Sequence, residues 1–282
     1  MGSWNDTTII SFDTETTGLD TTTARVVELA LVASTALSHG HLFLWERRLN
    51  PGIPIPVEAT AVHGISDSDV ANCPDFKCVG SEFARRLYTG TALLGFNALG
   101  YDVPLLDAEF ERADLPDRID TARVIDPLVF ARWHLRHIRS RALGALCAHF
   151  GVVLLDAHRA AGDARATLSV FNVMVAAQLI PATFEAAITE QIWLVSQLAT
   201  ETAAWGHWIY RDRDEGTLMF GAGKHTGVAL QQAPYGTLKW CLSLPDLHEG
   251  AAAEFRAELG RRRQQQATVL GKPPSDNGAQ DW

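Results

Sequence analysis

A short apolar stretch near the start of the chain runs directly into two acidic residues, and this combination limits the folds that the chain can adopt. Residues 8–12, Thr-Ile-Ile-Ser-Phe, are typical of a buried strand, and Asp13, Glu15 and a Thr-Thr-Gly turn follow them. Residues i and i+2 of a strand point to the same face, so Asp13 and Glu15 are expected side by side. Two carboxylates held this close repel each other, and a bound divalent cation is the usual compensation. A turn that carries two solvated acids is the alternative.

The order of the apolar patterns predicts the fold class. Strands are expected at residues 8–12, 26–33, 41–49 and 91–96, helices at residues 81–88, 103–113, 122–133, 141–150 and 160–177, and a turn-rich piece at residues 51–70. Strands that come first and are followed by alternating helices and strands are typical of an α/β layer with a mixed sheet. The 282 residues suffice for such a domain and for a smaller second part.

The remainder of the chain is predicted to form a small α+β module behind a connecting helix. Pro181 ends the first run of elements, and two short strand-like pieces, HWIYR and TLMF, then surround an acidic turn. Helical patterns follow at residues 237–244 and 250–263. The predicted organisation is a domain over residues 6–180, a connecting helix over 181–200, the module over 201–262 and a polar, disordered tail over 263–282.

Charge and composition narrow the function classes. The formal net charge of -9 and the pI of about 5.5 argue against strong non-specific binding of nucleic acid through a global field. They do not exclude a nucleic-acid enzyme, because carboxylates that hold a metal ion add to the negative total. The N-terminal residues lack the pattern of a signal peptide, no apolar stretch reaches membrane-spanning length, and the four cysteines form no CxxC pair. We expect a cytoplasmic protein with reduced cysteines and no membrane partner.

Three separated segments carry residues that together suit phosphodiester chemistry. Asp102 follows a predicted buried strand, and His158 and Asp163 lie around the start of a predicted helix. The carboxylates of these segments and of Asp13 and Glu15 suit Mg²⁺ or Mn²⁺, and two such ions clamp the attacking and leaving oxygens of an in-line displacement. A histidine can take the proton from the attacking water. Each residue of the later segments also has a plainer interpretation: a helix-dipole contact for Asp163, a surface loop for His158 and an N-cap for Asp102.

Four stretches resemble the sequence landmarks of the DEDDh 3′–5′ exonucleases, the DnaQ-like family. They are FDTETTGLD, VHGIS, FNALGYD and HRAAGD, and the similarity covers about residues 8–178. The resemblance implies an RNase H-like fold, in which helices flank a mixed sheet of five strands. It also implies nucleoside 5′-monophosphate products, His158 as the general base, and two Mg²⁺ or Mn²⁺ ions held by Asp13, Glu15, Asp102 and Asp163.

The same resemblance assigns the residues that follow the second acid to the substrate. Thr16, Thr17 and Gly18 would form a shelf for the terminal nucleotide, with backbone and hydroxyl contacts at close approach. Leu19 would wedge against the last base. A glycine at this point lets the backbone come near the sugar.

Two further residues match family positions, and each has two interpretations. Asn97 matches an asparagine of the second landmark, as a substrate contact or as a scaffold. Many members place this asparagine four residues before the aspartate, whereas Asn97 precedes Asp102 by five. His63 matches a recurrent His-Gly-Ile, with either a substrate role or a packing and turn role.

Two segments outside the landmarks also suggest nucleic acid. Residues 132–141 contain four arginines and two histidines, which predicts contact with a phosphate backbone, with a solvated helix end as the alternative. Residues 219–247 resemble the module that follows the exonuclease domain in exodeoxyribonuclease X-like proteins. Within them, GAGKHTG either cradles a phosphate with backbone N–H groups or forms a tight turn held by aromatic packing.

These features predict a 3′–5′ exonuclease that degrades DNA, with single-stranded or frayed 3′ ends as the favoured substrate. An exoribonuclease of the RNase T kind is the nearest alternative, because nothing in the sequence shows how a 2′-OH would be read. A proofreading subunit that acts beside a DNA polymerase or other replication and repair proteins is a second. A catalytically silent nucleic-acid-binding scaffold is a third, against which the complete set of four carboxylates and one histidine argues.

Overall fold

The computed structural model describes residues 4, 7–35, 43–89 and 92–269, and it contains two compact units. The first unit comprises Met1–Leu135 and Ser140–Val195, and the second comprises Arg136–Arg139 and Ser196–Trp282. The division between them lies inside one helix, α8 (Phe184–Trp205), which covers most of the segment predicted as a connecting helix.

A mixed sheet of five strands forms the centre of the first unit, as predicted. The strands are β1 (Thr8–Thr16), β2 (Val26–Thr35), β3 (Phe43–Arg48), β4 (Ala92–Leu94) and β5 (Val124–Ile125), in the order β3-β2-β1-β4-β5. β1 pairs antiparallel with β2 and parallel with β4, so it lies in the middle of the sheet. The predicted strand starts at residues 41–42 and 91 fall outside the described residues.

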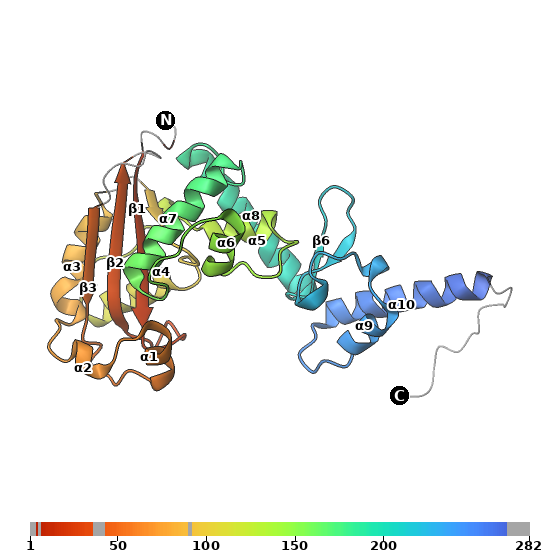
Figure 1. Ribbon diagram of the computed structural model, residues 1–282, viewed down its shortest axis with the longest axis horizontal. Helices are drawn as coiled ribbons and strands as arrows, with labels where there is room; N and C mark the ends of the chain where they lie inside the picture. Colours follow the sequence, from red (N-terminus) through yellow and green to blue (C-terminus); the bar gives the residue numbers. More distant parts are fainter. Residues whose placement is uncertain (1–3, 5–6, 36–42, 90–91, 270–282) are drawn as a thin grey trace. The chain divides into compact units, whose positions relative to one another are not determined.

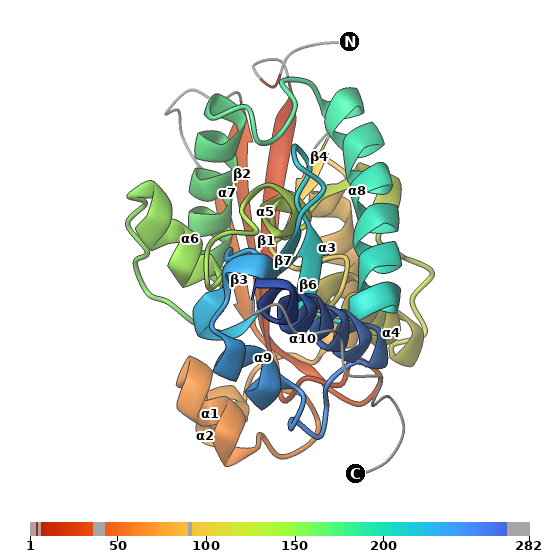
Figure 2. The same ribbon diagram turned by 90° about the vertical axis from the view of Figure 1, so that its right-hand side faces the viewer.

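Helices cover both faces of this sheet (Figures 1 and 2). On one face α7 (Ala160–Ala176) lies against β1 and β2, where the Ser11 hydroxyl donates to the Ala164 carbonyl. On the other face α3 (Phe76–Leu87) and α4 (Asp102–Arg112) bury their aromatic side chains in the core cluster that also contains Phe12 of β1. Because side chains alternate along a strand, Ser11, Asp13 and Glu15 share the α7 face.

Two shorter segments differ from the prediction. The helix predicted over residues 122–133 is instead a 3₁₀ turn (Thr121–Arg123), strand β5 and helix α5 (Pro127–His134). The reason is local: Asp126 caps α5 through the Leu128 N–H, and proline at the first helical position starts the helix there. The turn-rich piece holds two short helices, α1 (Val57–His63) and α2 (Asp67–Val70). Helix α6 (Leu143–Phe150) agrees with its predicted position.

The second unit has a small core of its own. It contains β6 (Ile209–Arg211), β7 (Leu218–Phe220), α9 (Tyr235–Cys241) and α10 (Glu249–Val269), with 3₁₀ turns at Gly223–His225 and Leu230–Gln232. The strands pair antiparallel at the two predicted pieces, and Phe220 stacks on Phe255 of α10. Leu238 of α9 and Ile209 of β6 complete the buried cluster.

Helix α10 corrects the predicted tail. It continues to Val269, so residues 263–269 are helical rather than disordered. Arginine, glutamine and alanine in this stretch favour a helix, and the first glycine and proline come only at Gly271 and Pro273. Residues 270–282 of the predicted tail lie outside the described residues. Within the described ranges, no helix combines the length and the apolar character needed to cross a membrane.

Candidate active site

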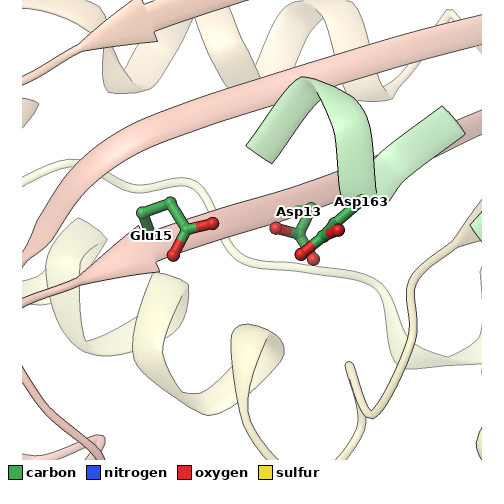
Figure 3. Close-up of side chains that lie close together, drawn as sticks. All are labelled: Asp13, Glu15 and Asp163. Carbon is green, nitrogen blue, oxygen red and sulfur yellow. The ribbon is translucent and has the colours of Figure 1, made fainter. Parts of the chain in front are cut away.

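Three of the predicted carboxylates meet on the α7 face of the sheet. Strand β1 continues to Thr16, so Asp13 and Glu15 lie within it rather than after it, and Asp163 is in the first turn of α7. One oxygen of each lies within 4.8 Å of the other two. Figure 3 shows the Asp163 side chain reaching from α7 to Asp13, with Glu15 farther along the strand. We call Asp13, Glu15 and Asp163 the acidic cluster.

Burial and mutual repulsion disfavour the charged forms of the acidic cluster. Burial raises the pKa of Asp13 well above its usual value, and the charges of Asp102 and Asp163 raise it further. Burial and the Asp163 charge raise the pKa of Glu15 to about 8. Burial also raises the pKa of Asp163, against the opposing effect of His158. A divalent cation would offset this repulsion, so the donor set fits a hard metal ion.

Asp102 lies beside the acidic cluster but is bonded elsewhere. It is the first residue of α4 and is 4% exposed. Its Oδ1 accepts a hydrogen bond of 2.7 Å from the Thr14 hydroxyl, and it is outside the group within 4.8 Å. Burial raises the pKa of Asp102 to about 7, although the Thr14 hydrogen bond opposes the shift. Its charge acts on Asp13, so the two carboxylates are neighbours.

His158 is exposed in the loop that leads into α7. Its φ of 60° is in the left-handed region, which is strained for a residue with a side chain and is typical of functional sites. The His158 backbone N–H donates to Asp163 Oδ2 at 3.3 Å, and both the charge of the His158 ring and this hydrogen bond lower the pKa of Asp163. The structure therefore brings the histidine to the acidic cluster, on the solvent side.

The predicted shelf is held by a residue that the sequence analysis missed. The Tyr101 hydroxyl donates to the Gly18 carbonyl and shares a hydrogen bond with the Thr16 hydroxyl. Thr17 is buried, and its hydroxyl accepts from the Arg25 N–H at 2.9 Å, which is a bracing role. Leu19 is 90% exposed and free of the core. The available signal for Tyr101 was an aromatic residue with a polar hydroxyl directly before a candidate ligand.

His63 and Asn97 both take part in turns. His63 ends α1, is 4% exposed, and accepts through Nδ1 from the Ile65 N–H at 3.0 Å. Burial lowers the pKa of His63. The Thr16 backbone lies close to the ring and partly opposes this lowering of the pKa. Within the described part of the chain, however, the His63 Nε2 makes no hydrogen bond of normal geometry. Asn97 has a φ of 60°, and its carbonyl accepts from the Tyr101 N–H, which supports the scaffold interpretation.

Buried Glu28 is a second residue that the sequence analysis missed. It lies on β2 opposite Glu15, and it accepts from Arg159 Nη2 at 2.7 Å and Nε at 3.0 Å and from the Ala160 N–H at 3.1 Å. Burial acts to raise the pKa of Glu28, but the hydrogen bonds from Arg159 and Ala160 outweigh it and leave the pKa lowered. Glu28 thus caps α7 from the neighbouring strand and fixes the helix start that carries His158. The sequence feature that could have identified Glu28 is a glutamate inside an apolar strand, because a buried glutamate requires a partner.

Buried Asp126 holds the turn before Asp102 in a similar way. Its carboxylate accepts from the Asn97 N–H at 2.9 Å, the Leu99 N–H at 3.3 Å and the Leu128 N–H at 3.0 Å. Burial raises the pKa of Asp126 to about 6, although these hydrogen bonds oppose the shift. The carboxylate therefore ties the turn at Asn97 to the start of α5.

Two other predicted contact segments contain residues that take part in packing. In residues 132–141, Arg136 is buried, pairs with Glu201 at 2.8 Å and lies over the Tyr210 ring. Of the same run, Arg132 and Arg139 are exposed. In GAGKHTG, the Gly227 N–H donates to the Phe220 carbonyl. The Phe220 ring lies 5.9 Å from the ring of His225 and 5.4 Å from that of Phe255, which favours the tight-turn interpretation.

Comparisons with known proteins identify the family to which residues 10–171 belong. The model of a family described as "Exonuclease" matches residues 10–171, which is more than half of the chain. A segment of DNA polymerase III PolC-type from Streptococcus pneumoniae is 35% identical over 164 residues, covering 58% of this chain and 11% of the polymerase. The chain thus corresponds to about a tenth of the curated relatives that it matches.

Solved nuclease structures share the fold. The zinc-bound complex of Escherichia coli ExoI with single-stranded DNA matches with a TM-score of 0.54 and 15% identity, over 86% of this chain and 60% of that one. Cell-death related nuclease 4 matches with a TM-score of 0.52 and 14% identity, over 60% of this chain and 64% of that one. The RNase H-like exonuclease fold is confirmed.

Proposed function

Because this chain belongs to the exonuclease family, we propose that it is a metal-dependent 3′–5′ exonuclease that hydrolyses DNA to nucleoside 5′-monophosphates. The observation that carries the proposal is the meeting of Asp13, Glu15 and Asp163 within 4.8 Å. Such a cluster is costly in a folded protein unless a cation binds it, since burial raises the pKa of each member and repulsion adds to the shifts of Asp13 and Glu15.

Two Mg²⁺ or Mn²⁺ ions are the proposed cofactors. The donors are carboxylate oxygens only, which is the chemistry that these hard cations prefer. The acidic cluster and Asp102 would hold them, and Asp102 would exchange its Thr14 hydrogen bond for a metal. When bound, such ions polarise a phosphodiester and stabilise the charge on its attacking and leaving oxygens.

His158 is the proposed general base. It lies beside Asp163 but is exposed, so its ring can reach a water molecule that enters from solvent. An imidazole accepts a proton near neutral pH, which suits the removal of a proton from attacking water. The Glu28–Arg159 pair holds the start of α7 and so keeps the histidine loop in place.

The shelf beside the acids is the proposed site of the 3′-terminal nucleotide. Thr16 and Gly18 would face the sugar, with Tyr101 holding both, and exposed Leu19 would meet the terminal base. The 4% exposure of His63 and its hydrogen bond from the Ile65 N–H favour the turn role over the substrate role. Thr17 and Asn97 would support the shelf and the turn before Asp102 rather than touch substrate.

DNA is the favoured substrate, because the chain matches a segment of DNA polymerase III PolC-type. A single-stranded or frayed 3′ end suits a chain of net charge -9, because a long duplex footprint needs many contacts from cations to phosphates. RNA is the alternative substrate. A DNA polymerase or other replication and repair proteins are the protein partners that the same similarity suggests.

The test compares 5′-labelled single-stranded DNA with RNA of the same sequence, each incubated with Mg²⁺ and with EDTA. We expect a ladder shortened from the 3′ end on DNA, with 5′-mononucleotides as products and no ladder in EDTA. Asp13→Ala should abolish the ladder, whereas Glu111→Gln, at an exposed acid on α4, should leave it unchanged. A ladder on RNA alone would move the protein to the ribonucleases. A folded wild-type protein without a ladder on either strand would overturn the proposal of a stand-alone exonuclease.

A further inference from the structure

The second unit presents an unusual helix face. The exposed residues of α9 are Tyr235, Gly236, Lys239 and Trp240, whereas Leu238 and Cys241 are buried in the core. Positions i, i+1, i+4 and i+5 fall within an arc of about 140° on a helix of 3.6 residues per turn. Two aromatic rings therefore flank a lysine and a glycine on one continuous face.

The two rings are open to solvent. Trp240 is 58% exposed and Tyr235 is 37% exposed. Between them, a Cβ added at Gly236 would meet no atom within 4 Å, so the space over the helix is free. In the described part of the second unit these two are the only exposed large hydrophobic residues, and no aliphatic side chain joins them. An apolar protein-docking surface would carry such neighbours.

Cations accompany the aromatic rings. The Lys239 ammonium lies 5.5 Å from the centre of the Tyr235 ring, and Arg263 Nε of α10 lies 3.3 Å from the Tyr235 hydroxyl. The neighbouring Arg262 is used in the fold, because it pairs with Glu258 and donates to three backbone carbonyls. The cations beside the aromatic rings are therefore Lys239 and Arg263.

The surrounding sequence is free of acids. Residues 216–245 contain no Asp or Glu, although the whole chain has 33 of them against 24 Lys and Arg. The acids of the second unit precede residue 216 or follow residue 245, and Glu249 and Glu258 of α10 pair with arginines. The stretch of sequence that contains α9 thus carries Lys224 and Lys239 without an acid, so its charge is opposite to the net charge of the chain, which suits a polyanion.

We propose that Tyr235, Lys239, Trp240 and Arg263, the aromatic face, bind single-stranded nucleic acid. Unpaired bases stack on exposed aromatic rings whatever their sequence, and lysine and arginine contact the phosphates between them. The inference rests on the proposed function for the identity of the ligand, but its residues belong to the second unit and not to the acidic site. The aromatic face would bind the strand of which the first unit removes the 3′ nucleotides.

The test measures binding of fluorescein-labelled dT20 by anisotropy, with the full chain in EDTA so that no hydrolysis occurs. We expect Trp240→Ala to weaken binding about 5- to 150-fold, since stacking on one aromatic ring contributes roughly 1–3 kcal/mol per base. Trp240→Phe should restore most of the affinity, whereas Trp240→Leu should not, because leucine keeps the apolar volume without a flat ring. Lys239→Gln and Arg263→Gln should each lower the salt dependence of binding by about one ion.

Matched controls are exposed residues of the first unit. Tyr88 is an exposed aromatic residue at the end of α3, and Lys77 is an exposed cation within α3. The Tyr88→Ala and Lys77→Gln variants should bind dT20 like the wild type. Circular dichroism checks that every variant is folded. Wild-type affinity in Trp240→Ala and Tyr235→Ala would overturn the inference, and wild-type affinity in Trp240→Leu would overturn the stacking and indicate an apolar docking surface. Because binding is measured without metal, a protein that binds through this face but does not cleave would contradict only the proposed function.

Discussion

The acidic site of the first unit and the aromatic face of the second unit are built in opposite ways. The acids come from β1, α4 and α7, and burial raises their pKa values. Three of the four residues of the aromatic face come from one helix of seven residues, and its rings are exposed. The free energy of a buried charge depends on every neighbouring group, whereas the contribution of an exposed aromatic ring to binding depends mainly on that ring. Substitutions should therefore have large, coupled effects at the acidic site and smaller, additive effects at the aromatic face.

The largest effect should follow from Asp163→Asn, which keeps the shape of the side chain but removes one ligand charge from the acidic cluster. The rate of DNA hydrolysis should fall by roughly 10³-fold or more, because charge stabilisation by the metal is lost in the transition state. In EDTA the variant should be at least as stable as the wild type, since a repulsive charge is gone. Single-turnover rates and thermal unfolding measure the two effects. Mg²⁺-dependent hydrolysis by this variant at the wild-type rate would show that Asp163 is not a metal ligand.

His158→Gln should have the next largest effect. Loss of a general base lowers rates by about 10²- to 10⁴-fold, and the exposed position means that folding should be unaffected. The variant should retain Mg²⁺ dependence and should bind dT20 in EDTA as the wild type does. The pH–rate profile is the decisive measurement, because the limb that reports the base should flatten. An unchanged profile would show that another group takes the proton.

Glu28→Gln tests whether the buried pair positions α7. The substitution leaves Arg159 without its main carboxylate partner, so we expect about 2 kcal/mol of destabilisation and a fall in kcat of roughly tenfold with little change in KM. Glu46→Gln is the matched control, because Glu46 accepts from the same Arg159 at 3.3 Å, whereas the Ala160 N–H at the first position of α7 donates to Glu28. Equal kcat values in the two variants would leave Glu28 with a purely structural role.

The smallest effect concerns the stability of the metal-free protein. The pKa of Glu15 is raised to about 8 and that of Asp102 to about 7, so the folded state holds protons that the unfolded chain has released. The contribution of these two groups to the stability of the protein in EDTA should therefore be most favourable below about pH 4 and should be lost as the pH rises toward 8. Between pH 6 and pH 8 we expect the Tm to drop by roughly 3–6 °C. Saturating Mg²⁺ should reduce this drop, and a Tm that rises over the same interval in EDTA would contradict the assigned pKa directions.

The sequence alone determined the parts of this protein that depend on local geometry. The alternation of side chains along a strand placed Asp13 and Glu15 on one face, and the short spacing from His158 to Asp163 placed both at the start of α7. The periods of the apolar residues located most helices and strands. They missed β5, because two residues are too few to show a strand period and they run directly into the apolar α5.

Only the tertiary structure decided what holds the site together. Glu28 and Arg159 are 131 residues apart, and Tyr101 meets Gly18 across 83 residues, so no local pattern could pair them. Packing of α7 and α4 against opposite faces of the sheet creates both contacts. A buried glutamate, or a tyrosine hydroxyl beside a backbone carbonyl, acquires its role from the partner that folding brings to it. Short segments of the sequence thus determine which chemical groups the site contains, whereas contacts between residues far apart in the sequence determine its geometry.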